Sequence, residues 1–192
     1  MRIGVLALQG AVSEHIAMLN KLGVEALAVK NAEEIKNIDG LILPGGESTT
    51  MGRLITKFNL APIIKKRINE GMPVYGTCAG MILLAKRIKN NEQFSLDVLD
   101  VTIVRNAFGR QVDSMEIDLD VKGLDSPFHA IFIRAPVAIE LGSGVEALAS
   151  VNEGIVFVRQ GNIFASSFHP ELGNDVRIHK MFLESVAKSK IL

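Results

Sequence analysis

Short apolar runs alternate with segments of helical spacing along the first half of the chain. Residues 3–8 form a continuous apolar run, which is typical of a strand buried on both faces of a sheet, and further short, mainly apolar runs occupy residues 24–29, 40–43 and 73–75. Apolar residues recur at helical spacing over residues 13–22, 49–55, 61–69 and 81–88. This alternation of strand and helix predicts βαβ units, and therefore a parallel sheet.

The pattern changes in the second half of the chain. Apolar and polar residues alternate imperfectly over residues 112–121. Strand-like runs then follow without clear helices between them, at residues 130–134, 147–151, 155–159 and 163–167. We expect antiparallel or mixed strands there, and a last amphipathic helix over residues 175–188. Because no linker, repeat or charge block interrupts the pattern, the sequence predicts a single α/β domain over residues 1–192.

Composition narrows the possible classes of function. Hydrophobic residues make up 48% of the 192 residues, which argues against intrinsic disorder. The 21 Lys and Arg residues balance 21 Asp and Glu residues, so a nucleic-acid partner is not expected. No apolar run has the length of a membrane span, and residues 1–10 lack a signal-peptide cleavage pattern. We therefore expect a soluble, cytoplasmic protein that binds neither nucleic acid nor a membrane.

The single cysteine, Cys78, lies in a Gly-Thr-Cys-Ala-Gly segment between an apolar strand and an apolar helix. This is the pattern of a nucleophile elbow with Cys in place of Ser. Small flanking residues permit a sharp turn, and the start of a helix favours the reactive thiolate. The N–H of Ala79 is free at the helix start and can bind an oxyanion. The alternative is a buried, inert cysteine.

One thiol also limits what else the chain can hold. A lone cysteine cannot form an internal disulfide, and it cannot build a zinc site of several cysteines. We therefore expect no metal and no cofactor.

The segment His169-Pro170-Glu171 offers partners for Cys78. Pro170 favours extended backbone at His169, and residues two apart in an extended chain face the same way. Glu171 can then orient the imidazole, which is left to take a proton from Cys78. Taken alone, the segment is more typical of a polar turn, and only its combination with the elbow points to catalysis. The other three histidines lack such a setting and are expected on the surface or on helix faces: His15, His129 and His179.

A Pro-Gly-Gly-Glu-Ser loop at residues 44–48 follows the third apolar run. Paired glycines let backbone N–H groups approach a ligand closely, so this loop can complete an oxyanion site with Ala79. An ordinary strand-to-helix turn is the alternative, and a phosphate loop is disfavoured because its Gly-Lys-Ser/Thr ending is absent. Residues 142–147 match a dinucleotide-binding pattern, but no long helix follows them, so we do not assign this function.

Three segments together resemble the class I, or triad, glutamine amidotransferases: the elbow, the Pro-Gly-Gly-Glu-Ser loop and Phe-His-Pro-Glu at residues 168–171. The resemblance narrows to the glutaminase subunits of pyridoxal 5′-phosphate synthase at residues 4–12, 43–51, 105–114 and 132–136. These segments span nearly the whole chain in the expected order. The resemblance implies a flavodoxin-like, three-layer α/β/α sandwich on a mixed, mainly parallel central sheet.

The resemblance also implies roles for individual residues. Cys78 would attack the carboxamide of L-glutamine to give a γ-glutamyl thioester and ammonia, with His169 as general base and acid and Glu171 orienting it. The backbone of Gly46 and Ala79 would hold the oxyanion. The implied glutamine-binding residues are Gly46, Glu47, Ser48, Arg105, Ile133 and Arg134. Without the resemblance, the two arginines would be interpreted as surface ion pairs.

The implied partner is the (β/α)8-barrel synthase subunit, which would use the ammonia to make pyridoxal 5′-phosphate (vitamin B6). Residues 8–10 end the first strand, and we expect them beside the active site and the docked synthase.

Three other functions stay open. An amidotransferase subunit that serves another ammonia-using synthase is disfavoured by residues 105–111. A related, peptidase-like cysteine hydrolase is disfavoured by the Pro-Gly-Gly-Glu-Ser loop together with His-Pro-Glu. A regulatory module without catalysis is disfavoured because Cys78, His169 and Glu171 are all present.

Overall fold

A single twisted sheet organises the chain in the computed structural model, which describes residues 1–108 and 114–189. Its first five strands are all parallel, in the spatial order β2 (Glu25–Val29), β1 (Arg2–Leu6), β3 (Gly40–Leu43), β4 (Val74–Thr77) and β12 (Ile163–Ser166). The sheet then continues through β11 (Gly154–Gln160), β9 (Val137–Leu141), β6 (Leu99–Val104) and β5 (Ala85–Ile88), with β10 (Glu146–Val151) paired to β11.

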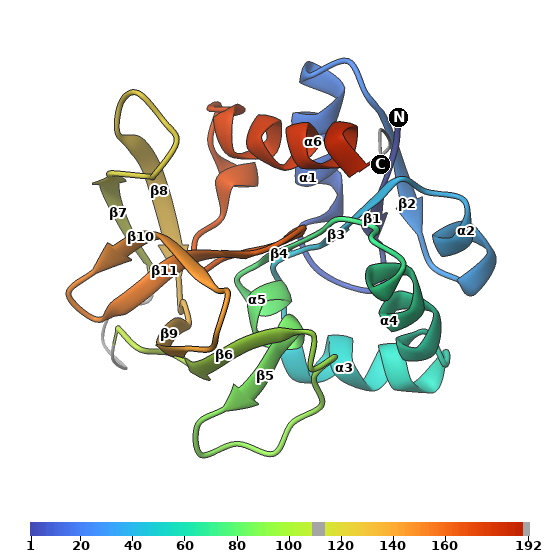
Figure 1. Ribbon diagram of the computed structural model, residues 1–192, viewed down its shortest axis with the longest axis horizontal. Coiled ribbons are helices and arrows are strands. Elements are labelled where there is room, and N and C mark those ends of the chain that lie inside the picture. The colour runs from blue at the N-terminus through green and yellow to red at the C-terminus, as the bar shows by residue number, and fades with distance from the viewer. Residues whose placement is uncertain (109–113, 190–192) are drawn as a thin grey trace.

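The second half of the sheet is mainly antiparallel. The β12–β11, β11–β9, β9–β6 and β10–β11 pairs are antiparallel, and only β5–β6 is parallel. A separate antiparallel hairpin is formed by β7 (Ser114–Leu119) and β8 (Phe128–Ile133) and lies at one side of the molecule in Figure 1. The predicted α/β fold with a mixed, mainly parallel sheet is thus confirmed.

Helices cover both faces of the parallel strands. The helices are α1 (Val12–Lys21), α2 (Ala32–Lys36), α3 (Ser48–Lys57), α4 (Ala61–Asn69), α5 (Ala79–Leu84) and α6 (Arg177–Ser189), with one 3-10 turn, η1 (Pro170–Leu172). Residues of α1 and α6 share one buried cluster, and residues of α2 to α5 share the other. Figure 1 shows α1 and α6 together above the parallel strands, with α3 and α5 below them.

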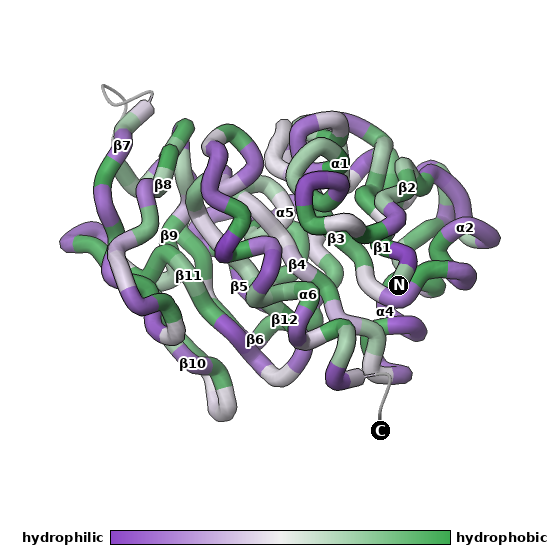
Figure 2. The backbone as a smooth tube through the Cα atoms, turned by 90° about the horizontal axis from the view of Figure 1, so that it is seen from above, coloured by the Kyte–Doolittle hydropathy of each residue, from purple (hydrophilic) through white to green (hydrophobic). Residues whose placement is uncertain are grey.

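Alternation along the strands explains the two clusters. In β3, Leu41 and Leu43 belong to one cluster and Ile42 to the other, and all three side chains are fully buried. Successive side chains of a strand point to opposite faces, so the unbroken apolar runs of the sequence fill a core on each side. Figure 2 shows hydrophobic residues along these central strands and hydrophilic residues on outer helices such as α2.

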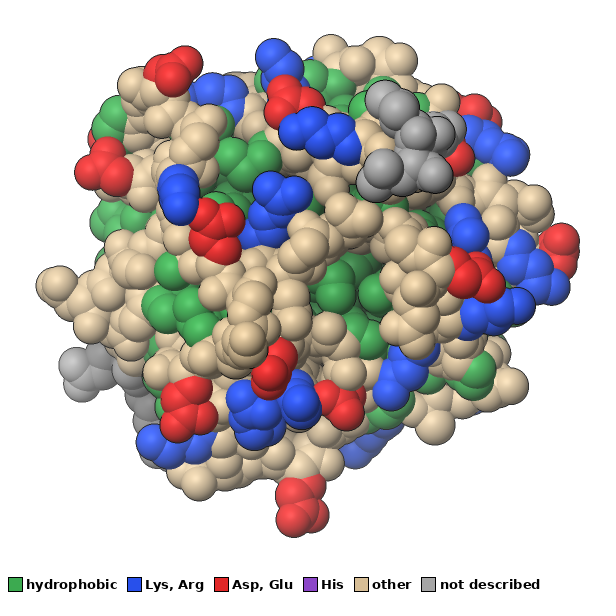
Figure 3. Space-filling model, in the orientation of Figure 1, with side chains coloured by type: hydrophobic (Ala, Val, Ile, Leu, Met, Phe, Trp, Pro, Cys, Tyr) green, Lys and Arg blue, Asp and Glu red, His purple; other side chains and the backbone are tan. Residues whose placement is uncertain are grey.

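The surface carries mixed charge. Figure 3 shows Lys and Arg side chains interspersed with Asp and Glu on the face it draws, in keeping with the formal net charge of zero. Among the described residues, no helix is long and apolar enough to cross a membrane.

One predicted helix was wrong in its extent. The apolar run at residues 81–88 was expected to be a single helix, but α5 ends at Leu84 and β5 begins at Ala85. Lys86 and Arg87 of β5 are exposed, as suits an edge strand, and β5 pairs with β6. Short apolar runs cannot distinguish helix from strand, and here the pairing with β6 decides. The elements α2, β6 and β9 were not predicted from the sequence, and residues 112–113 of the strand predicted at residues 112–121 lie outside the described residues.

Helix α5 packs unusually close to the sheet. A Cβ atom at Gly80 would lie 2.1 Å from the carbonyl oxygen of Leu43, and one at Gly76 would lie 2.5 Å from the carbonyl carbon of Gly80. Backbone atoms cannot retreat as a flexible side chain can, so both positions require glycine.

We predict that Gly80→Ala destabilises the fold by about 1–3 kcal/mol, because the added methyl group meets the β3 backbone. Urea unfolding followed by circular dichroism measures this loss. Gly173→Ala is the control, since a Cβ there has its nearest neighbour at 3.9 Å. Equal unfolding midpoints for both variants would contradict the prediction.

Candidate active site

Cys78 lies on a strained turn between β4 and α5. Its backbone angles are φ 47° and ψ −100°, a conformation that is costly for a residue with a side chain. Its N–H donates to the carbonyl oxygen of Ser166 on β12 at 2.7 Å, which fixes the turn to the neighbouring strand. The expected elbow geometry is therefore present: a sharp strand-to-helix turn with the cysteine at its tip.

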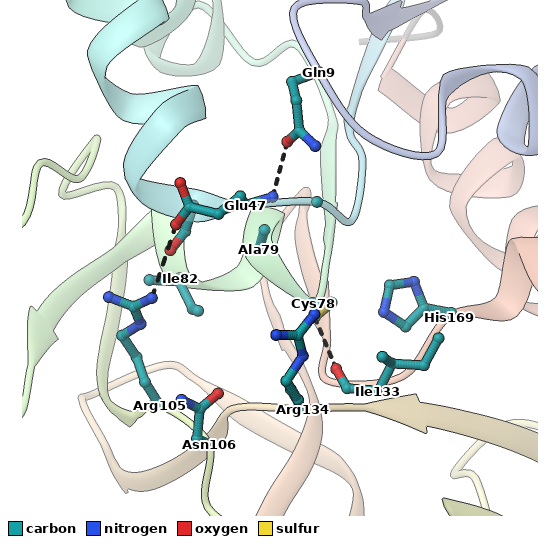
Figure 4. Close-up of a pocket in the computed structure, with 12 residues that line it drawn as sticks. Gln9, Glu47, Cys78, Ala79, Ile82, Arg105, Asn106, Ile133, Arg134 and His169 are labelled. Carbon is teal, nitrogen blue, oxygen red and sulfur yellow. Dashed lines mark hydrogen bonds and ion pairs between the residues drawn. The ribbon is translucent and has the colours of Figure 1, made fainter. Parts of the chain in front are cut away.

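The parallel pairing of β4 with β12 brings His169 to Cys78. Thr77 is in register with Ser166, so the residues that follow both strands emerge at the same edge of the sheet. The N–H of His169 also donates to the carbonyl oxygen of Ile131 on β8 at 2.8 Å. In Figure 4 the imidazole of His169 lies beside Cys78.

Glu171 orients the His169 ring. Its Oε1 atom lies 2.8 Å from Nδ1 of His169, and the carboxylate side chain is fully buried. Burial lowers the pKa of His169, but hydrogen bonds to Cys78 and Glu171 and the charges of both outweigh it and raise the pKa to about 10. The imidazole is therefore held protonated beside the thiol, ready to stabilise a thiolate and to donate a proton.

Two histidines behind the carboxylate correct an expectation from the sequence. His15 and His179 were expected on the surface or on helix faces, but both are completely buried; only His129 is exposed. His15 Nε2 lies 3.4 Å from Oε2 of Glu171, and His15 Nδ1 lies 3.0 Å from Nε2 of His179. Their helices, α1 and α6, point these side chains inward, which helical spacing alone could not reveal.

Burial and neighbouring charge set the ionisation of this cluster. Burial lowers the pKa of His15 more than the charge of Glu171 raises it, and burial lowers the pKa of His179 to about 3. Burial raises the pKa of Glu171, but His15 and His169 outweigh it and hold the pKa below its ordinary value. These shifts keep the carboxylate ionised beside the charged His169 and make both His15 and His179 less basic than a free imidazole.

A pocket of about 390 Å³ opens above Cys78, which is at the small end of the range for ligand sites. The structure places all the sequence-predicted residues except Glu171 on its lining: Gly46, Glu47, Ser48, Cys78, Ala79, Arg105, Ile133, Arg134 and His169. Glu171 lies behind His169. The motif at residues 105–114 is described only in part, since residues 109–113 lie outside the described residues.

Glu47 and Arg105 form an ion pair on one side of the pocket (Figure 4). Glu47 caps α3, where hydrogen bonds from Thr50 and Thr49 overcome desolvation and lower the pKa of its carboxyl to about 2. Nη2 of Arg105 lies 4.0 Å from Oε1 of Glu47, and Nη1 donates to Oε1 of Gln93 at 2.6 Å. With Arg134, which also lines the pocket, the site presents one carboxylate and two guanidinium groups to a ligand.

The glycine loop touches both His169 and residues 9–10. A Cβ at Gly45 would lie 2.4 Å from Cε1 of His169, and one at Gly46 would lie 2.4 Å from Oε1 of Gln9. The Gln9 side chain accepts a hydrogen bond from the N–H of Glu47 at 2.8 Å. The loop that contains Gln9 thus lies at the pocket, as expected, and fixes the glycine loop beside Cys78 and His169.

Four residues at the site were not assigned from the sequence. Gln9, Ile82 and Asn106 line the pocket, and Gln93 accepts from Arg105 and from the hydroxyl of Ser48. Asn106 and Arg134 have φ values of 50° and 44°. Ile82 follows the elbow by one helical turn and could have been found by that spacing; Gln93 carries no local signal. No group of His, Cys, Asp or Glu among the described residues could hold a metal ion.

Comparison with known proteins places the chain among amidotransferases. A model of the SNO glutamine amidotransferase family matches residues 5–188. Pyridoxal 5′-phosphate synthase subunit PdxT of Carboxydothermus hydrogenoformans is 51% identical over 189 residues, which cover 98% of this chain and 99% of that protein. The protein of the same name from Thermotoga maritima is 55% identical over 188 residues, covering 97% and 100%.

Solved structures agree. A crystal structure described as a glutamine amidotransferase has a TM-score of 0.92 and 51% identity, covering 96% of this chain and 98% of that one. The structure of PurLQS from Thermotoga maritima has a TM-score of 0.65 at 17% identity, covering 98% and 95%. The second likeness shows a shared fold alone.

We predict that stability falls below pH 6.5, because the buried imidazoles stay neutral while the unfolded chain binds protons. The pKa of His179 is about 3 when folded, below its ordinary 6.5, so its contribution is complete above pH 6.5 and is lost as the pH falls toward 3. Each buried histidine of this kind lowers the free energy of unfolding by about 1.4 kcal/mol for every pH unit below its ordinary pKa. Urea unfolding of the native chain and of His179→Phe between pH 7 and 5 measures it. The variant should have the shallower slope, and equal slopes would refute the assignment.

Proposed function

The chain belongs to the SNO glutamine amidotransferase family, and we propose that it is a glutaminase that hydrolyses L-glutamine to L-glutamate and ammonia for pyridoxal 5′-phosphate synthesis. The observation that carries this proposal is the placement of His169 beside Cys78 (Figure 4), with Nδ1 of His169 at 2.8 Å from Glu171, at a pocket of amino-acid size. The relatives at 51% and 55% identity bear the name of a pyridoxal 5′-phosphate synthase subunit, which supports the pathway.

The proposed first step is attack of the Cys78 thiolate on the carboxamide carbon of glutamine. Its oxyanion would be bound by the N–H groups of Gly46 and Ala79, of which Ala79 begins α5 and has no intrahelical acceptor. The protonated His169 then gives its proton to the leaving nitrogen, so that ammonia departs and a γ-glutamyl thioester remains.

The second step is hydrolysis of that thioester. His169, now neutral, would take a proton from an attacking water, and the sulfur then leaves as a thiolate while glutamic acid forms. His169 keeps the proton, so the starting pair of thiolate and imidazolium is restored, and the product releases its carboxyl proton to solvent as glutamate. Glu171 holds the ring by Nδ1 throughout, which leaves Nε2 for both transfers. One imidazole therefore serves as acid and then as base.

The glutamine-binding residues we propose are Gly46, Glu47, Ser48, Arg105, Ile133 and Arg134. Glu47 is ionised and suits the α-ammonium group, while an arginine suits the α-carboxylate. The carbonyl oxygen of Ile133 lies 3.8 Å from the Cys78 sulfur, so a bound carboxamide would pass close to it.

We further propose that a (β/α)8-barrel synthase subunit docks near Gln9 and receives the ammonia. The side chain of Gln9 reaches the glycine loop, so a partner that touches residues 8–10 can influence the oxyanion site.

The parallel strand order β2-β1-β3-β4-β12 supports a flavodoxin-like, three-layer core. One continuous sheet likewise supports a single domain over residues 1–192. A cytoplasmic location stays a prediction.

The first test is glutamate release from glutamine, measured with and without the synthase subunit, for the native chain and Cys78→Ala. We expect activity that rises with the synthase and falls at least about 1,000-fold in the variant. Activity that is lost with Cys78 but indifferent to the synthase would move the chain to another pathway. Undiminished activity of Cys78→Ala would refute the mechanism.

A second prediction concerns the substrate carboxylate. Replacing Arg105 with Gln removes a charge-assisted hydrogen bond, so KM for glutamine should rise about 10- to 100-fold while kcat changes little. Steady-state kinetics of the complex measure both constants. Arg87→Gln is the matched control, because Arg87 pairs with Asp100 away from the pocket and should keep the native KM. An unchanged KM in Arg105→Gln would assign the carboxylate to another residue.

A further inference from the structure

His15 on α1 contacts the far side of the triad carboxylate, outside the pocket. It is completely buried, with Nε2 at 3.4 Å from Oε2 of Glu171 and 3.1 Å from Oγ1 of Thr77. Its other nitrogen, Nδ1, lies 3.0 Å from Nε2 of His179 on α6. Nothing in the proposed reaction uses either histidine, yet both lie in line with Cys78, His169 and Glu171.

The need to give each buried N–H an acceptor favours one placement of the protons on His15 and His179. If His15 carried its proton on Nδ1, it would donate to His179, and its Nε2 lone pair would face the carboxylate. His179 would then carry a buried N–H at Nδ1, where no acceptor is found among the described residues. Orphaned buried N–H groups are rare, whereas an orphaned acceptor costs less.

The opposite arrangement satisfies both imidazole donors. His179 donates from Nε2–H to Nδ1 of His15, and His15 donates from Nε2–H to Oγ1 of Thr77 at 3.1 Å. Nδ1 of His179 has no partner among the described residues, but in this arrangement it is an acceptor. Oε2 of Glu171 also has no hydrogen-bond partner among the described residues, and Nε2 of His15 lies 3.4 Å from it. A neutral His15 thus turns an N–H toward the carboxylate without adding a charge.

We propose that His15 is a positioning residue of the triad, which donates Nε2–H toward the second oxygen of Glu171 and so fixes the carboxylate that orients His169. His179 holds His15 in the required tautomer. The inference deepens the proposed function, because it concerns the same triad, but its test does not depend on glutamine as the substrate.

The other charged or titratable groups near this line are few. Tyr75 on β4 faces Glu171 and His179, and its hydroxyl is hydrogen-bonded to Ser166 at 2.8 Å. Burial raises the pKa of Tyr75 well above its ordinary value, so it stays neutral. Glu14 on α1 acts on His15 from the helix surface. Neither group offers Glu171 a donor in place of His15.

The test is the pH dependence of Cys78 alkylation by iodoacetamide in native chain, His15→Leu, His15→Gln and His15→Asn. A glutamine amide nitrogen can reach the position of Nε2, whereas an asparagine amide reaches only that of Nδ1. Loss of the donor weakens the carboxylate's hold on the charged imidazole, so the thiolate should form at higher pH. In His15→Leu and His15→Asn we expect the acid limb of the alkylation rate profile to move up by about one pH unit, so that the alkylation rate on that limb is about tenfold lower. In His15→Gln we expect the acid limb to return to its native position.

A merely structural role would lower the unfolding midpoint of all three variants and leave the alkylation profile in place, which overturns the proposal. The proposal is also overturned if the acid limb of the alkylation profile shifts as far in His15→Gln as in His15→Asn. If the variants do not fold, nitrogen-15 NMR of the native chain decides. A neutral His15 with its proton on Nε2 from pH 6 to 8 supports the proposal, and an Nδ1–H or charged His15 refutes it. Failure of glutaminase activity with a normal alkylation response would refute only the proposed function.

Discussion

The parallel pairing of β4 with β12 is the constraint on which the site depends. These strands are far apart in the sequence, but Thr77 lies in register with Ser166, and the Cys78 N–H donates to the Ser166 carbonyl oxygen. A slip of one residue would move His169 by about 3.3 Å, beyond hydrogen-bond reach of the thiol. The apolar cores on both faces fix the register, because a slip would turn every buried side chain to the wrong face.

The charges of Glu171 and His169 are stabilised by each other and by their buried neighbours. A buried carboxylate is costly unless it is paired, and Glu171 has the protonated His169 on one oxygen and His15 on the other. Because the two imidazoles behind it stay neutral, they satisfy polar atoms without competing for its charge. The positive charge is thereby kept on His169, next to the sulfur, where the chemistry needs it.

Local sequence determined much of this arrangement. The small residues around Cys78 predicted the elbow, and the close packing of Gly76 and Gly80 on backbone explains why they are glycines. The Pro-Gly-Gly loop predicted a close backbone approach, and Gly45 and Gly46 lie against His169 and Gln9. Such motifs can be predicted from sequence because their constraints act over a few residues. The strands of the parallel sheet were predictable for the same reason, since each contains a short, mainly apolar run.

Contacts between distant segments were decided only by the tertiary structure. His15 and His179 carry no local signal, and α1 and α6 bring them behind Glu171 only when both pack on the same face of the sheet. Gln93 reaches Arg105 from a loop, and residues 85–88 become a strand because β6 is available as a partner. The sequence by itself thus determined the reacting groups and their local geometry. The long-range packing decided which buried groups surround them, because burial and partnership are properties of the assembled core.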